Sequence, residues 1–537
     1  TILDDDITFL ELPLASAKTL DFPSFQHKTS LYPLFNGIFM GGLTIQRYGI
    51  ASILRLLFIH VMTIHQTCCY PPILLYSHPT GEKMSESHHA PVQWSSRLAF
   101  ILAASGSAVG LGNLWKFPYL TGENGGGAFV LVYMACVALI GIPLMAAETL
   151  IGRRGRGSPV HAMRQLAHTH GFSRHWQLLG WGGMLASLLI LSYYSVIAGW
   201  SMAYIFKMNN PMNSHPSPEM ATAMFQGLLA EPKIQFIWHT LFMTITMLIV
   251  SRGVSQGLEK SSRALMPGLL IMLLVLVFYG MSTDSFGAAF SFMFKPDFSK
   301  LGSESLLIAM GQAFFSLGLG MGTIMVYGAY LPDNIRISHS IYFIAATDTG
   351  VALLAGLAIF PVVFENHLQP GMGPGLIFET LPLAFSHMPM GTTVGTLFFV
   401  LVFVAALTSS IALLEPVTAW SIERFGLERG SAAFYCASLA WLLGIGSMLS
   451  FSTWSDLRLL DRNFFETIDF ITADLMLPLG GLMIAVFAGW RLPEALCRAE
   501  LHAEDPGHAV FPYWWKLIRF VVPAAVLLIL LSEMRGG

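Results

Sequence analysis

The chain has 537 residues, of which 54% are hydrophobic and only 11% are charged. Soluble domains carry about 25% charged residues, so this composition argues against a disordered chain, a nucleic-acid binder and an ordinary soluble enzyme. The formal net charge of −3 at pH 7 is close to neutral and indicates no polyanionic partner. The mean hydropathy of +0.61 is typical of a chain that lies largely in a lipid bilayer.

Residues 1–83 differ in pattern from the rest. An apolar stretch at 51–76 is interrupted by Arg55, His60 and His65, and it lacks a small-residue cleavage site, so it makes a poor signal peptide. We expect residues 1–83 to be an N-terminal extension that is disordered or not part of the functional protein. The alternative is that residues 51–76 form an additional membrane segment. Residues 84–537 are expected to form the functional domain.

From residue 97 onward, apolar runs long enough to cross a bilayer, about 20 residues each, follow one another. They lie near 97–121, 126–151, 177–206, 233–251, 263–281, 304–331, 340–365, 390–424, 431–451, 467–490 and 514–533. None resembles the alternating strands of a membrane barrel, and lipid requires backbone polar groups to be paired internally. We therefore predict an all-α polytopic membrane protein with about eleven transmembrane helices.

Lysine and arginine concentrate in the loops that follow even-numbered spans. The loop after the second span holds five arginines and no acid, and the loop after the fourth span is also basic. Cytoplasmic loops carry an excess of these residues. We predict a cytoplasmic N-terminus and an outside C-terminus. The loop at 207–232 has no glycosylation sequon, which favours a prokaryotic cell (inner) membrane.

Glycines interrupt two spans, five spans apart. They are Gly106, Gly110 and Gly112 in the first span, and Gly318, Gly320 and Gly322 in the sixth. Each helix-interior glycine costs up to about 1 kcal/mol relative to alanine, so both segments are predicted to unwind. Interrupted spans in corresponding positions of two halves point to a transporter binding site. Close helix packing of the GxxxG type is the alternative explanation.

Residues 97–133, 257–267 and 407–416 closely resemble the first two spans, the loop between spans four and five, and the eighth span of the neurotransmitter:sodium symporters. The similarity extends from about Trp94 to Arg519, and the eleven spans resemble those of the bacterial, amino-acid type. It implies a leucine-transporter-like fold in which spans 1–5 (about 94–281) and 6–10 (about 304–490) are an inverted repeat. It also implies a Na⁺-coupled symporter that imports an α-amino acid by alternating access.

The resemblance implies a substrate site between the unwound parts of spans one and six. The matching positions are Ser107, Ala108, Gly110, Gly112, Ile190, Tyr194, Phe315, Ser316, Gly318, Met321, Ser409 and Leu413. Relatives that carry monoamines have an aspartate where Gly110 stands, so a substrate with its own carboxylate fits better here. Tyr194 matches the tyrosine that binds this carboxylate. Met321 adapts its shape and Gly318 frees volume, which favours a large aliphatic or aromatic amino acid.

The resemblance also implies two sodium sites built from oxygen ligands, which hard cations prefer. The first comprises Ala108, Asn113, Ser316 and Asp348, and the second Gly106, Val109, Ala405, Thr408 and Ser409. A carboxylate inside a span is a functional candidate by default. Some relatives have asparagine at position 348 and bind chloride nearby, where Tyr133, Gln312 and Ser316 match. We interpret Asp348 as replacing chloride, which predicts chloride-independent transport.

Gate positions follow from the same resemblance. Lys116 and Asp469 match the outer pair, and Trp94, Tyr330 and Glu423 match inner positions. The usual inner arginine is replaced by Pro91, for which Arg97 or Lys83 is a possible substitute. Glu148 and Glu415 are further acids inside spans, which we interpret as parts of a polar network beneath the substrate site.

Three other functions stay open at this point. An enzyme is disfavoured because neither HExxH nor GxSxG occurs, so we predict that the protein is not an enzyme. A channel or a sensor could keep the same ligands, and a proton-coupled transporter is disfavoured by the hydroxyls of Thr408 and Ser409. The expected partners are an amino acid, sodium ions and the lipid bilayer, with no nucleic acid, in a monomer or homodimer.

Overall fold

A computed structural model of the chain describes residues 93–209, 217–368, 375–459, 461–501 and 511–536. All of these belong to one unit, which runs from His88 to Gly537. The extension predicted at 1–83 lies outside the described residues, as does Pro91. Within the described ranges the regular elements are helices, and the only β-bridge is an isolated one between Leu459 and Arg462.

The long apolar segments occupy the positions predicted for the eleven spans. They are α3 (Arg97–Ala108), η1 (Gly112–Lys116), α4 (Phe117–Glu123), α5 (Gly127–Cys136), η2 (Val137–Gly141), α6 (Ile142–Gly155), α8 (Gln177–Lys207), α10 (Pro232–Ser251), η5 (Val254–Glu259), α11 (Lys260–Met281), α13 (Ser303–Ser316), α14 (Thr323–Ala329), α15 (Ile337–Glu365), α17 (Gly391–Phe425), α18 (Arg429–Leu449), α19 (Phe464–Asp469), η8 (Phe470–Met476), α20 (Leu477–Val486), η9 (Phe487–Arg491), α22 (Phe511–Lys516), η10 (Leu517–Val521) and α23 (Val522–Gly536).

Nine continuous helices in the described part of the chain are long and apolar enough to cross a membrane. The first predicted span is a tenth, because α3 and the helix from Gly112 to Glu123 pass the same test together with a bend of 52° between them. The sixth predicted span consists of α13 and α14, which are separated by residues 317–322. The two spans predicted to unwind are therefore the two that are broken.

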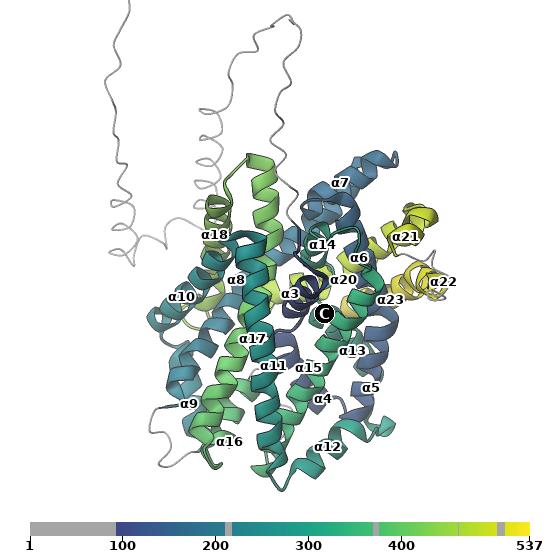
Figure 1. The fold of residues 1–537 in the computed structure, drawn as a ribbon. Coiled ribbons are helices and arrows are strands. Elements are labelled where there is room, and N and C mark those ends of the chain that lie inside the picture. The colour runs from purple at the N-terminus through teal and green to yellow at the C-terminus, as the bar shows by residue number, and fades with distance from the viewer. Residues whose placement is uncertain (1–92, 210–216, 369–374, 460, 502–510, 537) are drawn as a thin grey trace, which may run out of the picture. The chain divides into compact units, whose positions relative to one another are not determined.

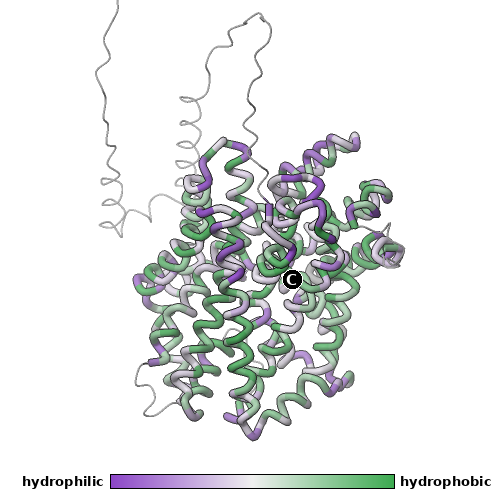
Figure 2. Tube along the Cα trace, in the orientation of Figure 1, coloured by the Kyte–Doolittle hydropathy of each residue, from purple (hydrophilic) through white to green (hydrophobic). Residues whose placement is uncertain are grey.

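Shorter helices connect the spans: α7 (Pro159–Thr169), η3 (Arg174–Trp176), α9 (Pro218–Leu229), α12 (Phe286–Phe294), η6 (Phe298–Lys300), η7 (Leu376–Thr380), α16 (Leu381–Ser386) and α21 (Glu494–Glu500). Figure 1 shows α7 and α21 at one end of the helix bundle and α9, α12 and α16 at the other. Apolar residues fill the middle of the bundle, and hydrophilic residues gather at both ends (Figure 2). This pattern is that of a multi-span membrane protein.

Side-chain caps fix several helix starts. Ser96, Ser158 and Ser217 accept hydrogen bonds from the backbone N–H groups three residues further on, at the starts of α3, α7 and α9. Asn463 and Glu466 form a reciprocal capping box at the start of α19. Such caps satisfy donors that helix geometry leaves unpaired, and each contributes about 1 kcal/mol.

The two longest helices, α8 and α17, pack against each other along much of their length. Both are buried over 83% of their most apolar stretch, whereas α10 and α11 are buried over only 33% and leave more apolar surface for lipid. The broken first span contacts α11, α15 and α17, and α14 packs against α6. The two breaks therefore lie inside the bundle, among buried helices.

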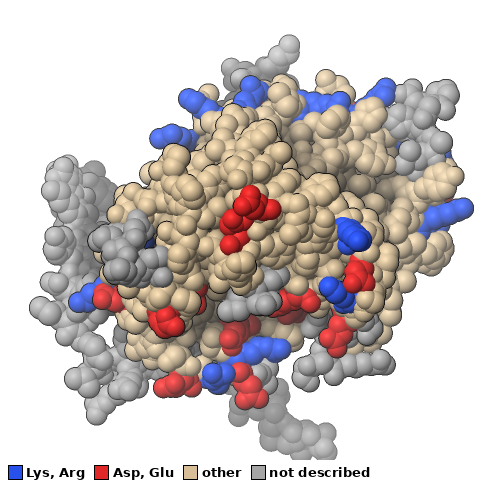
Figure 3. Space-filling model, turned by 90° about the horizontal axis from the view of Figure 1, so that it is seen from below, with Lys and Arg blue, Asp and Glu red and all other residues tan. Residues whose placement is uncertain are grey.

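The two ends differ in charge. The end that carries α9, α12 and α16 has acidic side chains spread over its surface, some of them beside basic ones (Figure 3). The opposite end holds Arg153, Arg154 and Arg156, which follow one another at the end of α6.

Candidate functional site

The first span is interrupted after Ala108. Val109 leaves the helical conformation with ψ of 107°, although its N–H still donates to the Ser105 carbonyl over 2.7 Å. The chain becomes helical again at Gly112, where η1 begins. The interruption frees backbone groups for other partners, because the Val109 carbonyl accepts a hydrogen bond from the Ser409 hydroxyl on α17 over 3.2 Å.

The sixth span is interrupted by alternating glycines in the left-handed region, with φ of +64° at Gly318, +79° at Gly320 and +76° at Gly322. This region favours glycine because other residues suffer a clash with their own Cβ. A Cβ on Gly320 would also lie 2.6 Å from the Leu477 carbonyl oxygen. The Gly320 N–H donates to the Glu148 carboxylate over 2.6 Å, so α6 supports the unwound segment directly.

One cavity lies between the two interruptions, α8 and α17. It is lined by Ser107, Ala108, Gly110, Gly112, Ile190, Tyr194, Phe315, Gly318, Met321, Thr323, Ser409 and Leu413. The structure thus brings together all the positions predicted for the substrate except Ser316, and it adds Thr323. The role of these residues in substrate binding stays a prediction.

Polar groups gather in the cavity around Gly110. A Cβ at this position would lie 2.5 Å from the Ser409 hydroxyl and 2.7 Å from the Tyr194 hydroxyl. The Tyr194 oxygen accepts the Leu111 N–H over 3.1 Å, which leaves the phenol proton to donate elsewhere. The missing side chain at 110 therefore lets the Ser409 and Tyr194 hydroxyls approach the backbone of the first span closely.

Thr323 is the cavity residue that the sequence analysis missed. It is the first residue of α14, directly after the last glycine of the interruption, and its side chain is 1% exposed. The signal was available, since Thr323 follows the predicted residue Met321 by two positions in the same unwound segment.

The residues predicted for the first sodium site surround Asn113. Its amide nitrogen donates to the Asp348 carboxylate over 2.8 Å and to the Ser316 hydroxyl over 3.0 Å, while its amide oxygen accepts the Gly110 N–H over 3.0 Å. An amide oxygen can bind a cation and an amide nitrogen cannot. In this structure the Asn113 amide nitrogen faces Asp348 and Ser316, and the amide oxygen faces Gly110.

Asp348 is fully buried on α15. Besides Asn113, the Ser316 hydroxyl donates to its carboxylate over 2.7 Å, and the Tyr133 hydroxyl lies 3.4 Å from it. Gln312, predicted for the same environment, donates to the Gly112 carbonyl instead, over 2.9 Å. Neutral donors thus surround this carboxylate, and the described residues give it no ion pair.

The residues predicted for the second sodium site lie where α3 meets α17. A Cβ on Gly106 would lie 3.3 Å from Cβ of Thr408, so the two helices approach closely. The Thr408 hydroxyl donates to the Ala405 carbonyl over 2.9 Å, within its own helix. The Ser409 hydroxyl bridges to the Val109 carbonyl, as described above. Hydroxyl and carbonyl oxygens therefore meet at this crossing, and sodium binding there stays a prediction.

The predicted outer pair is not formed among the described residues. The Lys116 ammonium lies 4.8 Å from the ring centroid of Phe315, a cation–π contact, and not against Asp469. Phe315 also lines the cavity, so Lys116 contacts a residue of the candidate substrate site.

The inner positions Trp94 and Tyr330 contact each other. The Trp94 N–H donates to the Tyr330 carbonyl and its indole N–H to the Tyr327 carbonyl, both over 2.9 Å. The Tyr330 hydroxyl donates to Glu415 over 2.6 Å, and Glu415 forms an ion pair with Arg429. Arg429 also donates to the Val250 carbonyl of α10. Glu415 therefore has a cationic partner, Arg429, that the sequence analysis missed.

Glu423, the third inner position, is exposed and accepts hydrogen bonds from the N–H and hydroxyl of Ser158, over 2.7 and 2.5 Å. Arg97, considered as a substitute for the arginine that Pro91 replaces, lies over the Phe343 ring at 5.4 Å. Lys83 lies outside the described residues. Among the described residues, Arg97 therefore forms no ion pair that would replace the one made by the missing arginine.

Two charged residues of the 257–267 motif hold the chain just before α3. Glu259 accepts hydrogen bonds from the N–H and hydroxyl of Ser95, and Arg263 pairs with Glu259 over 2.7 Å while donating to the Ser95 hydroxyl over 2.8 Å. The motif therefore anchors the start of the first span.

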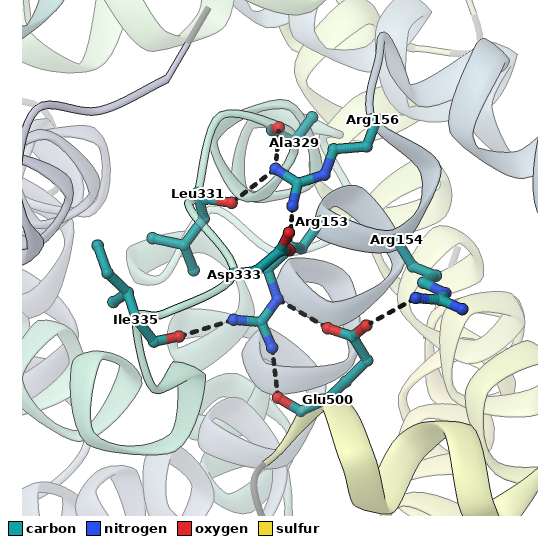
Figure 4. Close-up of polar contacts among 8 residues, drawn as sticks. All are labelled: Arg153, Arg154, Arg156, Ala329, Leu331, Asp333, Ile335 and Glu500. Atoms are coloured by element: carbon teal, nitrogen blue, oxygen red, sulfur yellow. Dashed lines mark hydrogen bonds and ion pairs between the residues drawn. The ribbon is translucent and has the colours of Figure 1, made fainter. Parts of the chain in front are cut away.

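An arginine cluster, formed by Arg153, Arg154 and Arg156, lies at the end of α6 (Figure 4). Arg153, only 3% exposed, donates to the Glu500 carboxylate of α21 over 2.7 Å and to the Ile335 carbonyl over 2.7 Å. Arg156 donates to the Leu331 carbonyl over 2.8 Å and pairs with Asp333. The end of α6 is thus joined to α21 and to the loop that follows α14.

The geometry agrees with what comparisons with known proteins find. Residues 92–213 and 224–535 match the sodium:neurotransmitter symporter family. An uncharacterized sodium-dependent transporter of Bacillus subtilis is 37% identical over 83% of this chain and 98% of its own length. The sodium- and chloride-dependent glycine transporter 2 of Xenopus laevis is 24% identical over 64% of this chain and 52% of its own.

Among solved structures, the crystal structure of MhsT in complex with L-phenylalanine is similar to this chain. The two share 41% identity with a TM-score of 0.76, over 82% of this chain and 99% of that one. The predicted fold class, a leucine-transporter-like arrangement of membrane helices, is confirmed by this match.

Proposed function

The chain belongs to the sodium:neurotransmitter symporter family, whose bacterial relatives are sodium-dependent transporters, and from this premise we propose that it imports a large aliphatic or aromatic α-amino acid together with Na⁺. The observation that carries the proposal is the cavity at the two interruptions, where the Tyr194 and Ser409 hydroxyls meet the backbone at Gly110. The L-phenylalanine in MhsT supports an amino acid as the substrate.

A carboxylate of the substrate would lie in the cavity beside the Tyr194 hydroxyl. It would accept the Tyr194 proton and lie near the start of η1, where backbone N–H groups and the helix dipole favour an anion. The apolar side chains of Ile190, Met321 and Leu413 would surround the remainder of the substrate. This division suits an amino acid better than a monoamine, which has no carboxylate to accept the Tyr194 proton.

Two sodium ions would couple transport to the sodium gradient. The first would bind among Ala108, Asn113, Ser316 and Asp348, with the substrate carboxylate as a shared ligand. The second would bind among Gly106, Val109, Ala405, Thr408 and Ser409. The shared ligand supports coupling, because each partner then binds more tightly when the other is present.

Asp348 would supply the negative charge that makes chloride unnecessary. Its carboxylate is buried and receives only neutral donors from Asn113, Ser316 and Tyr133, so a cation is the partner that its charge lacks. Chloride-independent uptake is the corresponding expectation.

Alternating access would involve the contacts at the inner end. Trp94, Tyr330, Glu415 and Arg429 link the start of the first span through α14 to α17 and α18, and these contacts would break when the inner side opens. The arginines near α7 and α21 support a cytoplasmic location for this end, and so a cytoplasmic N-terminus and an outside C-terminus in the cell membrane.

Uptake of radiolabelled amino acids, from glycine to tryptophan, into proteoliposomes tests the proposal. We expect concentrative uptake of large apolar amino acids under an imposed Na⁺ gradient, loss of uptake when K⁺ replaces Na⁺, and no change when gluconate replaces Cl⁻. Uptake indifferent to Na⁺ would contradict the sodium assignments and favour a proton-coupled mechanism. Binding without uptake would instead indicate a sensor.

A further inference from the structure

We propose that Thr323 makes the cavity selective for a substrate side chain that ends in a hydrogen-bond donor, such as the phenol group of tyrosine, over an apolar side chain of similar shape. The proposal rests on the amino-acid site proposed above. It specifies which of the large aliphatic or aromatic amino acids the site prefers.

The Thr323 hydroxyl oxygen borders the free space of the cavity beside Gly318. Apart from Gly318 and its chain neighbours, the described residues place two atoms within 4 Å of a Cβ built on Gly318, the Thr323 hydroxyl oxygen at 3.7 Å and the Met321 sulfur at 3.9 Å. A substrate group in this space therefore meets a hydroxyl and a thioether, while Ile190 and Leu413 supply apolar walls elsewhere in the cavity. Of the two bordering atoms, only the hydroxyl forms strong hydrogen bonds.

The direction of the Thr323 hydroxyl bond determines which partner it can take. Its proton is directed to the Gly318 carbonyl, over a long distance of 3.4 Å, and this is its only hydrogen bond among the described residues. The oxygen keeps lone pairs that accept a second hydrogen bond. The matching substrate group is thus a donor, as a phenol O–H or an indole N–H is and the edge of a phenylalanine ring is not.

The burial of Thr323 makes the difference in affinity between tyrosine and phenylalanine large enough to measure. Thr323 is 1% exposed, so a donor that enters the cavity loses its water partners. An unpaired buried donor is disfavoured, and a net hydrogen bond in this setting corresponds to about fivefold in affinity. If Thr323 served only the start of α14, its hydroxyl would bond the backbone alone and would not distinguish tyrosine from phenylalanine.

The test compares initial rates of Na⁺-driven uptake of tyrosine and phenylalanine in proteoliposomes. Thr323→Val keeps the shape and removes the hydroxyl, and we expect the tyrosine-to-phenylalanine ratio of kcat/KM to fall about fivefold. Thr323→Ser should keep most of the preference. Thr418→Val is the matched control, because Thr418 is a buried threonine on α17 whose hydroxyl bonds the Leu414 carbonyl outside the cavity.

The outcomes separate this inference from the proposed function. A protein that carries phenylalanine and tyrosine equally, or a Thr323→Val variant with an unchanged ratio, overturns the role of Thr323 and leaves the amino-acid symporter intact. A fall of the same size in Thr418→Val also overturns it. If no amino acid is taken up in response to Na⁺, the proposed function fails and the inference fails with it.

Discussion

Asn113 on η1 and Asp348 on α15 lie 235 positions apart in the sequence, yet the amide of one donates to the carboxylate of the other over 2.8 Å. This contact joins the broken first span to the seventh predicted span, and Ser316 at the end of α13 joins both. The two interrupted spans therefore meet at a single buried carboxylate.

Neutralising this carboxylate is expected to weaken sodium binding. Asp348→Asn should raise the Na⁺ concentration for half-maximal uptake by about tenfold or more, since interactions with a charged group contribute about 1.5–3 kcal/mol. The Na⁺ dependence of uptake measures this. Glu365→Gln is the control, because Glu365 lies on the same helix and accepts the Ser285 N–H outside the site. An unchanged Na⁺ dependence in Asp348→Asn would exclude Asp348 as a ligand.

The neighbouring hydroxyls on α17 offer a second comparison. Thr408→Val removes an oxygen predicted to bind the second sodium ion and should reduce the apparent Na⁺ affinity severalfold, because a hard cation needs each oxygen ligand. Ser410→Ala should leave that affinity unchanged, since the Ser410 hydroxyl is buried without a partner among the described residues. Equal effects of the two substitutions would argue against this site.

The ion pair between Glu415 and Arg429 is expected to stabilise the folded protein, because each of the two charges is neutralised by the other. Glu415 is fully buried and Arg429 is 21% exposed, so Glu415→Gln leaves a mostly buried cation without its partner. The free energy of unfolding should fall by about 3–5 kcal/mol, and the double variant Glu415→Leu/Arg429→Leu should recover part of it. Thermal unfolding in detergent gives the comparison. Additive losses in the double variant would show that the two residues act independently.

Cys497 on α21 reports on the arginine cluster. Burial, with smaller contributions from Glu500 and Glu494, raises the pKa of its thiol to about 12. Because the thiolate is the reactive form, maleimide labelling at pH 7.5 should be far slower than for a free cysteine and should accelerate as the pH rises toward that value.

Arg153→Ala removes the contact that holds α21 and should speed this labelling, because the helix is released from α6. Cys497→Ala supplies the background from the other cysteines. Rapid labelling of the unmodified chain would show that α21 is not held in the arrangement of Figure 4.

The interruptions and most of the cavity could be predicted from the sequence. Clustered glycines are costly in a helix, so they mark the breaks without any knowledge of packing. Once Gly110 and Met321 were assigned to the two breaks, the facing positions on α8 and α17 followed from the family resemblance. All but Ser316 of the predicted substrate residues line the cavity in the structure.

Long-range polar pairs were harder to predict, for physical reasons. Arg153 and Glu500 are 347 positions apart, and their pairing depends on how α21 folds back on the end of α6. Arg429 follows Glu415 by 14 positions, but the pair requires the turn between α17 and α18. Likewise the direction of the Asn113 amide depends on Ser316 and Asp348 from two other segments, which no local pattern specifies.

The glycines of the sixth span differ in whether another residue could replace them during evolution. At Gly320 both the left-handed backbone and the Leu477 carbonyl exclude any side chain. At Gly318 the backbone is left-handed as well, but a Cβ meets nothing closer than 3.7 Å, so only a backbone strain of about 1–2 kcal/mol opposes a substitution. A single mutation at this position, to asparagine for instance, could redirect the protein to a smaller cargo while its ion ligands stay unchanged.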